Sequence, residues 1–311
     1  MKKFNIKKIL IPLDFSETSL LAMEDGAYMA SLFKADITLL NVIRLNWSAY
    51  RMGDLPLADD FMIYQEENAL QRLNQLADEM RHKFDIQIET KLETGFVSPA
   101  IVEVAEKCNA DLIIMGTHGV SGFMERFIGS NAYRVVNDST CPVITIQART
   151  KRKGFKEIVL PIDNSLYSRQ KVDHVIELAN HYDSRIHILG LTHAADENEI
   201  NKLKIRLKEI EEYIDKNALI PNTQIGSNKQ IRQGVNYAKN TMAYADEIGA
   251  DLIVIMTEWE ENVTGLFIGP FARQIVNHSK IPVMSIRPDV EAELVGDRPL
   301  WMESPLKYYF E

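Results

Sequence analysis

The sequence predicts two α/β domains in tandem, each built on a parallel β-sheet with helices on both faces. Three observations support this prediction. The chain has 311 residues, a length that suits two domains better than one. Four sequence blocks recur in the same order in the two halves. Within each half, short apolar runs alternate with longer amphipathic segments, as expected of parallel strands joined by crossover helices.

The repeat indicates where the domains begin and end. Pro12-Leu13-Asp14 returns as Pro161-Ile162-Asp163, and residues 127–129 return as 267–269. The remaining blocks pair residues 109–115 with 249–256 and 135–143 with 275–283. We expect a first domain over 1–148, a basic linker over 149–154, a second domain over 155–288 and a tail over 289–311.

Most strands of the first domain are predicted from continuous apolar runs, which are typical of strands buried on both faces, and the strand at 86–92 is predicted from its alternating pattern. In chain order, the predicted strands are 9–13, 37–43, 86–92, 112–115 and 142–147. Ligands of such sheets bind beyond the carboxyl ends of the strands. The loops that follow Leu13, Ile43 and Met115 all open on that edge.

The helices are predicted from capping residues and apolar spacing. Ser16 is expected to cap the first helix, and Ser98-Pro99 gives a cap followed by a proline at the first helical position. The predicted helices are 16–32, 62–82, 98–109 and 130–137, with a long loop at 44–60. The apolar stripe expected on the longest of them is Leu70, Leu73, Ala77 and Met80.

The longest helix of the second copy carries apolar residues at spacings of three and four. They cover barely two heptads, so a single amphipathic helix on the sheet is favoured over a coiled coil. These residues are Ile200, Leu203, Leu207, Ile210 and Ile214. The tail, with aromatic residues between Trp301 and Phe310, reads as an extended arm that packs on a domain of its own chain or of a partner. A disordered tail and a partner-docking motif are the alternatives.

Composition excludes several classes of function. The net charge of −9 argues against nucleic acid as a partner, because phosphate-backbone binding needs a basic face. No apolar run approaches the ~18 residues of a membrane span, and the run after the N-terminus is too short for a signal peptide. Cys108 and Cys141 form no CxxC pair. We therefore expect a cytoplasmic protein without a membrane partner.

One loop has the features of a phosphate site. It follows the strand at 112–115 and contains Gly116, Gly119, Gly129 and Ser130. Glycines let the backbone approach a phosphate, and the N–H groups and dipole at a helix start favour an anion. Ser130 is expected to cap the helix and to add a hydroxyl donor. The Gly-Lys-Ser/Thr ending of a Walker A loop is absent.

From the residues alone, each of these features also has a structural explanation. A glycine-rich loop after a strand can be a plain turn. Asp14 can cap the first helix instead of accepting hydrogen bonds from a ribose or base, and His118 can be an ordinary loop residue. Cys141 suits a buried, apolar-like position. The sequence offers no metal-ligand spacing, no catalytic triad and no acid–base carboxylate pair.

These motifs resemble the universal stress protein (UspA) family over about residues 5–147 and 155–287. The resemblance implies two Rossmann-like, adenine nucleotide alpha hydrolase-like domains, each with a five-stranded parallel sheet of order 3-2-1-4-5. It also implies that domains pair through their fifth strands, either within the chain or in a homodimer. The matched motifs are G-x2-G-x9-G-[S/T] at Gly116, Gly119, Gly129 and Ser130, and Pro-x-Asp at Pro12-Leu13-Asp14.

The resemblance further implies an ATP site in the first domain. Asp14 and the Val42 backbone would hold the adenine, and Pro12 and Leu13 would line its pocket. The expected cofactor is ATP, ADP or AMP, with or without magnesium. The residues that would hold the ribose and phosphates are Met115, Gly116, His118, Gly119, Gly129, Ser130 and Asn131.

The second copy departs from this pattern. Counting from the preceding strand aligns Thr257 with Gly116 and Glu260 with Gly119, and makes the loop one residue shorter. Two glycines of the phosphate loop are therefore lost in this alignment.

The second copy also changes the charge of the loop and the start of its helix. Pro270 replaces Ser130, which removes a hydroxyl and a backbone donor. Glu258, Glu260 and Glu261 add negative charge. Each like charge costs on the order of 3 kcal/mol at about 5 Å and an effective dielectric constant of ~20. A helix terminus contributes up to about 2 kcal/mol, so we expect a single ATP site, in the first domain. The alternative is that these carboxylates point to solvent and a shifted loop still binds nucleotide.

The favoured function is a nucleotide-binding stress or signalling module, in which ATP occupancy alters shape or partner choice. A slow ATPase or ATP-dependent transferase is a second hypothesis, and a nucleotide-free scaffold whose second domain binds another ligand is a third. The loop lacks a P-loop lysine, a carboxylate pair for magnesium and an evident base, which disfavours efficient catalysis. A Gly116→Glu change is expected to abolish binding without unfolding the chain.

Overall fold

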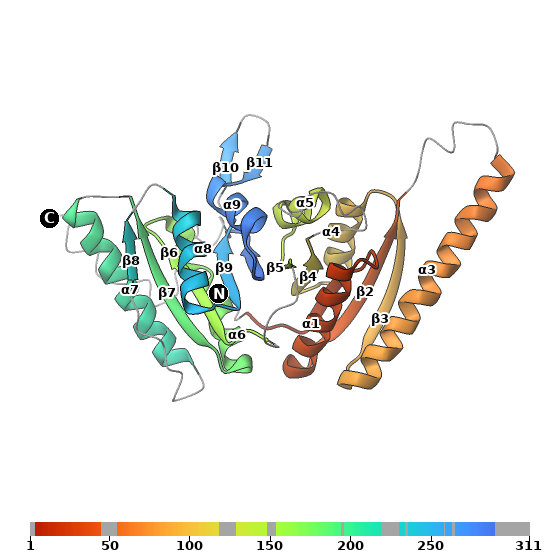
Figure 1. Ribbon diagram of the computed structural model, residues 1–311, viewed down its shortest axis with the longest axis horizontal. Helices are drawn as coiled ribbons and strands as arrows, with labels where there is room; N and C mark the ends of the chain where they lie inside the picture. The colour runs from red at the N-terminus through yellow and green to blue at the C-terminus, as the bar shows by residue number, and fades with distance from the viewer. Residues whose placement is uncertain are drawn as a thin grey trace.

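The computed structural model describes residues 4–44, 55–117, 129–147, 154–193, 196–218, 230–233, 236–257, 259–262 and 265–289. Strands and helices alternate along both halves of the chain (Figure 1). The first half contains β1 (Lys8–Pro12), α1 (Glu17–Phe33), β2 (Asp36–Ile43), α3 (Leu55–Phe84), β3 (Ile88–Thr94), α4 (Val97–Lys107), β4 (Leu112–Gly116), α5 (Ser130–Asp138) and β5 (Val143–Ile146).

The second half repeats this order and adds a hairpin before its last helix. Its elements are β6 (Glu157–Ile162), the 3-10 helix η1 (Leu166–Arg169), α6 (Val172–Tyr182), β7 (Arg185–Thr192), α7 (Glu197–Asn217), β8 (Gln230–Gln233), α8 (Tyr237–Ile248), β9 (Leu252–Met256), β10 (Trp259–Asn262), β11 (Gly265–Ile268), α9 (Pro270–His278) and β12 (Val283–Ile286).

The main sheet has ten strands in the order β3-β2-β1-β4-β5-β12-β9-β6-β7-β8. Each half therefore has the predicted order 3-2-1-4-5, and the prediction of two Rossmann-like α/β domains is confirmed. Within this sheet, the strands of each half pair in parallel. Where the halves meet, β5 and β12 pair antiparallel, with Thr145 opposite Val283 and Val143 opposite Ser285.

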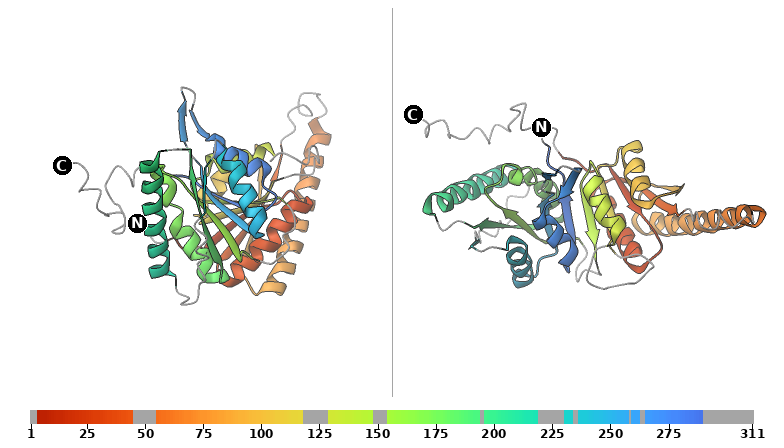
Figure 2. Two further views of the ribbon diagram at one scale, coloured as in Figure 1. Left: turned by 60° about the vertical axis from the view of Figure 1, so that its left-hand side comes forward. Right: turned by 90° about the horizontal axis from the view of Figure 1, so that it is seen from above.

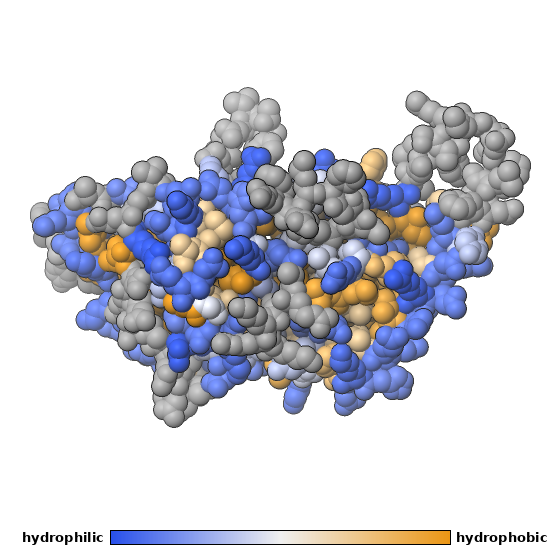
Figure 3. All heavy atoms as spheres, viewed as in Figure 1, coloured by the Kyte–Doolittle hydropathy of each residue, from blue (hydrophilic) through white to orange (hydrophobic). Residues whose placement is uncertain are grey.

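The core lies on both faces of this sheet. Helices α1, α3, α6 and α7 bury their apolar residues against one face, and α4, α5, α8 and α9 cover the other. Figure 2 shows helices on both sides of the strands when the molecule is seen from above. On the face shown in Figure 3, apolar residues gather over the region of α1 and hydrophilic residues dominate the edges. The central strands are apolar throughout because both of their faces are covered.

Several element boundaries differ from the predictions. Helix α3 begins at Leu55 and not near residue 62, so the loop predicted at 44–60 ends before Leu55. Its first turns extend past the strands (Figure 1), and Leu70 is 41% exposed instead of joining the buried stripe. Ser98 does not cap α4, because the N-cap is Phe96 and Ser98 is buried within the first turn. Ser16 does cap α1, accepting a hydrogen bond from the Ser19 backbone N–H.

The second half confirms the prediction of a single amphipathic helix and adds an element that was not predicted. Leu203, Leu207 and Ile210 of α7 are buried on the sheet side of that helix. Strands β10 and β11 form an antiparallel hairpin in a segment that was treated as a loop. Within the part of the chain that the structure describes, no helix has the length and apolar character required to cross a membrane. The predicted aromatic tail lies outside the described residues.

Candidate functional site

A pocket of about 590 Å³ opens at the carboxyl ends of β1, β2 and β4, beside the first turn of α5. This is the sheet edge at which the strand order reverses, where the fold class places ligands. Every predicted site residue that the structure describes lines the pocket, and the predicted His118 and Gly119 lie outside the described residues. The predicted residues at the pocket are Pro12, Leu13, Asp14, Val42, Met115, Gly116, Gly129, Ser130 and Asn131.

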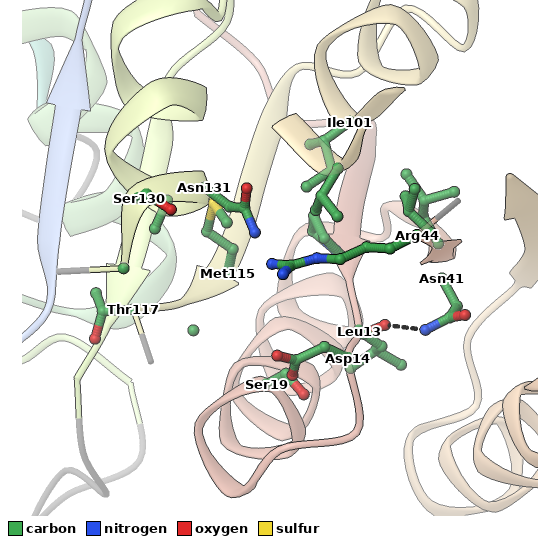
Figure 4. Close-up of a pocket in the computed structure, with 17 residues that line it drawn as sticks. Leu13, Asp14, Ser19, Asn41, Arg44, Ile101, Met115, Thr117, Ser130 and Asn131 are labelled. Atoms are coloured by element: carbon green, nitrogen blue, oxygen red, sulfur yellow. Dashed lines mark hydrogen bonds between the residues drawn. The ribbon is translucent and has the colours of Figure 1, made fainter. Parts of the chain in front are cut away.

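Asp14 contributes both to the local turn and to the pocket. Its Oδ1 accepts hydrogen bonds from the Ser16 backbone N–H at 3.0 Å and from the Ser16 hydroxyl at 2.5 Å. The side chain is exposed and lies beside the pocket in Figure 4. A carboxylate accepts several hydrogen bonds at once, so the structural explanation and the ligand-binding explanation are compatible at this residue.

The start of α5 leaves backbone donors at the pocket. Gly129, and not Ser130, is the N-cap residue, because Ser130 already has helical geometry as the first residue of α5. The Gly129 N–H donates to the Thr117 carbonyl at 2.6 Å, so it is not available to a ligand. Residues 130–132 follow and line the pocket. Their N–H groups belong to the first turn, which has no intrahelical acceptors, and they suit an anionic group.

Gly116 is needed for packing as well as for the loop. A Cβ at this position would lie 2.7 Å from the Thr18 carbonyl carbon and 2.8 Å from the Ser19 nitrogen. Backbone atoms at the start of α1 would have to shift to accept any side chain. The expectation that Gly116→Glu abolishes binding without unfolding the chain stays a prediction, but the change would also strain the contact between β4 and α1.

The pocket also contains polar side chains that sequence reasoning missed. Asn41 is buried and donates from Nδ2 to the Leu13 carbonyl at 2.6 Å, which ties the ends of β1 and β2 together. Arg44 extends from the end of β2 to the middle of the pocket, between Asn131 and Asp14 (Figure 4). A usable signal existed for Arg44, because it directly follows a predicted strand whose end faces this edge.

The second half has a counterpart of only about 20 Å³. Pro161, Asp163 and Ser168 line it in the places that Pro12, Asp14 and Ser19 occupy in the first pocket. The two pockets are therefore equivalent sites with very different capacities. The other lining residues are Ser165, Lys171, Leu191, Tyr237, Met256 and Phe271.

The structure corrects the alignment of the two loops. Gly116 pairs with Ile146 on the neighbouring strand, and Met256 pairs with Ile286. The next residue in each half, Thr117 or Thr257, donates its N–H to the carbonyl of that partner, at 3.0 Å and 2.8 Å. Met256 and not Thr257 therefore occupies the place of Gly116, and the loop is not shortened. The sequence alignment treated Met115 and Met256 as equivalent because both are methionines. The hydrogen-bond register, and not the residue type, determines which residues are equivalent.

Bulky side chains account for the small volume of the second pocket. Tyr237 begins α8 where Val97 begins α4, and Phe271 is the second residue of α9 where Asn131 is the second residue of α5. Glu258 lies outside the described residues, and only the backbone of Glu260 and Glu261 is described. The expected repulsion by these glutamates stays a prediction.

Metal binding and thiol reactivity depend on how the histidine, cysteine and acidic side chains are arranged. Among the described residues, no group of three or more histidine, cysteine or acidic side chains is placed to hold a metal ion. Cys141 is only partly buried, short of the buried position predicted for it, and desolvation raises the pKa of its thiol to about 11. The thiolate is the reactive form, so this cysteine is unsuited to act as a nucleophile near neutral pH.

Comparisons with known proteins agree with the fold and the repeat. A universal stress protein of Methanocaldococcus jannaschii is 32% identical over 147 residues, which cover 47% of this chain and 84% of that protein. A universal stress protein of Mycolicibacterium smegmatis is 22% identical over 292 residues, covering 90% and 97%. The crystal structure of a universal stress protein from Archaeoglobus fulgidus matches with a TM-score of 0.69 at 20% identity, covering 93% and 98%.

The family model of the universal stress proteins matches the chain twice, at residues 5–147 and 154–287. The two matches account for both halves of the ten-stranded sheet. The chain therefore belongs to the universal stress protein family.

Proposed function

We propose that the protein binds one adenine nucleotide, ATP, ADP or AMP, in the pocket of its first half, and that nucleotide occupancy makes it a stress-response or signalling module. The observation that carries the proposal is the 590 Å³ pocket, which joins Asp14 and Val42 at one end to the first turn of α5 at the other. The first end suits a base and ribose, and the second suits phosphates. The volume lies in the range of small-molecule sites.

The lining residues favour binding over turnover. Asp14 is the only carboxylate among the residues that line the described part of the pocket, and Arg44 is the only cation. Efficient phosphoryl transfer requires metal-holding carboxylates and a group that orients the nucleophile. The proposal therefore includes no catalytic residue. Any magnesium at the site would enter bound to the nucleotide.

The second half is proposed to bind no nucleotide in the equivalent way. Its pocket of about 20 Å³ has room for little more than one water molecule. The reason expected from the sequence was electrostatic repulsion by glutamates. The support from the pocket is steric, because the large side chains of Tyr237, Phe271 and Met256 occupy the site.

A matched pair of charge substitutions tests the site. Ser130 and Pro270 are the first residues of α5 and α9, and both are exposed. Glutamate is well tolerated in a first helical turn, so both variants should fold. In Ser130→Glu, a carboxylate beside the phosphates costs on the order of 3 kcal/mol, a loss of roughly 100-fold in affinity. Pro270→Glu should leave binding unchanged.

Calorimetric titration with ATP, ADP and AMP gives both the affinity and the stoichiometry. The expected result for the wild-type chain is one nucleotide per chain, supported by mass spectrometry of small molecules released on denaturation. Two nucleotides per chain would contradict the proposal for the second half. Unchanged binding by Ser130→Glu would place the nucleotide elsewhere, and no binding by the wild-type chain would refute the proposed function.

We also propose that the two domains pair within one chain through β5 and β12. The proposal is supported by the register that sets Met284 opposite Ile144, both fully buried. The Thr145 hydroxyl adds a hydrogen bond to the Val283 carbonyl at 3.4 Å.

We place the protein in the cytoplasm. The free cysteines Cys108 and Cys141 suit that reducing compartment.

A further inference from the structure

The two pockets can be compared residue by residue at their base-binding ends. In the first half, Pro12 pairs with Leu40, and Arg44 follows four residues later at the end of β2. In the second half, Pro161 pairs with Leu189, and His193 follows four residues later at the end of β7. Arg44 and His193 therefore occupy equivalent places.

In the second half, His193 lies flat on an aromatic ring. Its imidazole stacks on Tyr237 with ring centroids 3.9 Å apart and an interplanar angle of 10°. Tyr237 lines the small pocket and occupies the place of Val97 in the first half. A stacked pair of planar groups thus stands where the first half has a planar guanidinium, an aliphatic side chain and a large cavity.

We propose that Arg44 stacks on the base of the nucleotide, so that the base takes the place that the Tyr237 ring fills in the second half. This inference rests on the proposed function, because it names the contact that one end of that site makes. A guanidinium is planar and weakly hydrated and stacks readily on π-systems. Val97 is smaller than tyrosine by an aromatic ring, so the first half lacks a ring of its own at this place.

The equivalence of Arg44 with His193, which stacks on an aromatic ring, favours the base over the phosphates as the partner of Arg44. The backbone of Arg44 comes two residues after Val42, on the β2 side of the pocket, and its guanidinium lies between Asn131 and Asp14 (Figure 4). The phosphates already have the N–H groups in the first turn of α5. The guanidinium extends from the β2 side into the middle of the pocket (Figure 4). A contact with the phosphates is the competing outcome, and the test separates the two.

The test compares Arg44→His, Arg44→Lys and Arg44→Ala by calorimetric titration with adenosine and with ATP at pH 8. At this pH a histidine is neutral but keeps a flat ring, whereas a lysine keeps the charge and has no plane. Stacking predicts that Arg44→Ala weakens adenosine and ATP by a similar factor, roughly 5- to 50-fold. It also predicts that Arg44→His binds both ligands more tightly than Arg44→Lys does.

The opposite ranking would overturn the inference. If Arg44→Lys keeps ATP affinity while Arg44→His loses it, and adenosine binding is unaffected by all three changes, Arg44 contacts the phosphates. Equal affinity in all variants would also overturn it. Both results would leave the proposed function standing, because that function fails only when the wild-type chain binds no adenine nucleotide.

A second variant tests the pocket from the other side. Val97→Tyr introduces in the first half the ring that the second half carries at Tyr237. The new ring should stack on Arg44 and exclude nucleotide, with an affinity loss of 100-fold or more as an order-of-magnitude expectation. Val97→Leu, which adds volume without a ring, serves as the control and should lose much less. Wild-type affinity in Val97→Tyr would show that the base does not occupy this place.

Discussion

At the scale of single residues, His174 connects the two halves and responds to pH. It belongs to α6, and its ring lies 4.1 Å from that of Phe4, which precedes β1. Its Nδ1 is 3.3 Å from the Gln170 carbonyl oxygen. Burial lowers the pKa of His174 to about 4, and the contact with the Gln170 carbonyl opposes this only in part. The neutral ring is therefore the form that the folded protein stabilises.

This pKa sets a window for loss of stability in acid. The unfolded chain takes up the proton near pH 6.5, and the folded chain only near pH 4. The contribution of His174 to the free energy of unfolding is fully present above pH 6.5 and is lost as the pH falls from 6.5 to 4. Below pH 4 it does not change further. The loss is up to about 3 kcal/mol. Urea unfolding of the wild type and His174→Gln at pH 7.5 and 4.5 measures it.

The variant should show a smaller drop in unfolding free energy between these two pH values. His82→Gln, at an exposed histidine on α3, is the control and should behave as the wild type. Parallel pH profiles for the wild type and His174→Gln would contradict the role of this residue.

At the scale of elements, the two halves differ in the first turn after their first strands. Helix α1 begins at Glu17 and can approach β4 because Gly116 has no Cβ. Met256 stands at that place in the second half. There the equivalent turn is the 3-10 helix η1, and α6 begins only at Val172. Where the strand carries glycine, as at Gly116, the neighbouring helix α1 begins early and packs closely. Where it carries Met256, a 3-10 turn comes first and α6 begins later.

This difference predicts unequal effects at two equivalent serines. Ser16 and Ser165 each donate a hydrogen bond from the hydroxyl to the preceding aspartate, at 2.5 Å and 2.6 Å. Only Ser16 also accepts from a backbone N–H of its helix, that of Ser19 at 3.3 Å. Ser16→Ala should therefore cost about 1 kcal/mol more unfolding free energy than Ser165→Ala. Equal losses in urea titrations would show that the cap contributes nothing.

At the scale of the whole molecule, contacts between α1 and α6 add to those between β5 and β12. Phe33 stacks on His181 with centroids 3.9 Å apart, and Tyr28 lies 6.2 Å from Tyr182. Burial raises the pKa of Tyr182 well above its usual value, so this ring remains neutral. The halves therefore meet both along the sheet and on one helical face.

Pairing within one chain predicts concentration-independent protection of β5 from hydrogen exchange. In an isolated domain β5 and β3 would both be edge strands, and β12 makes only β5 internal. Hydrogen exchange measured over a hundredfold range of protein concentration should show stronger protection of β5 than of β3. The protection of β5 should not change with concentration. Protection of β5 that rises with concentration would indicate that β5 pairs between chains.

Much of the fold was predictable because its signals are local. Continuous apolar runs identified most of the strands, since a strand covered on both faces tolerates few polar side chains, and alternation identified the strand at the edge, β3. The four-block repeat identified two similar halves. Boundaries were less accurate where tertiary packing overrides capping preference, as at Ser98, which is buried inside the first turn of α4. The start of α3 was missed because its first turns reach beyond the sheet.

The candidate site was predictable in part. The motif and the resemblance identified Asp14, Gly129 and Ser130, which the structure brings to one pocket. Arg44 and Asn41 were missed because their places depend on how far β2 extends before it reaches the pocket. No local pattern marks Asn41, which lies within the predicted strand, whereas the place of Arg44 directly after that strand was a usable signal.

The sequence by itself determined the α/β class, the duplication and the loop after β4, because apolar periodicity and repeated motifs are properties of neighbouring residues. Only the tertiary structure decided that Met256 stands at the place of Gly116 and that Tyr237 fills the second pocket. It also decided that Arg44 enters the first pocket. These features arise where strands and helices distant in the chain converge, and hydrogen-bond register and side-chain volume set the outcome there.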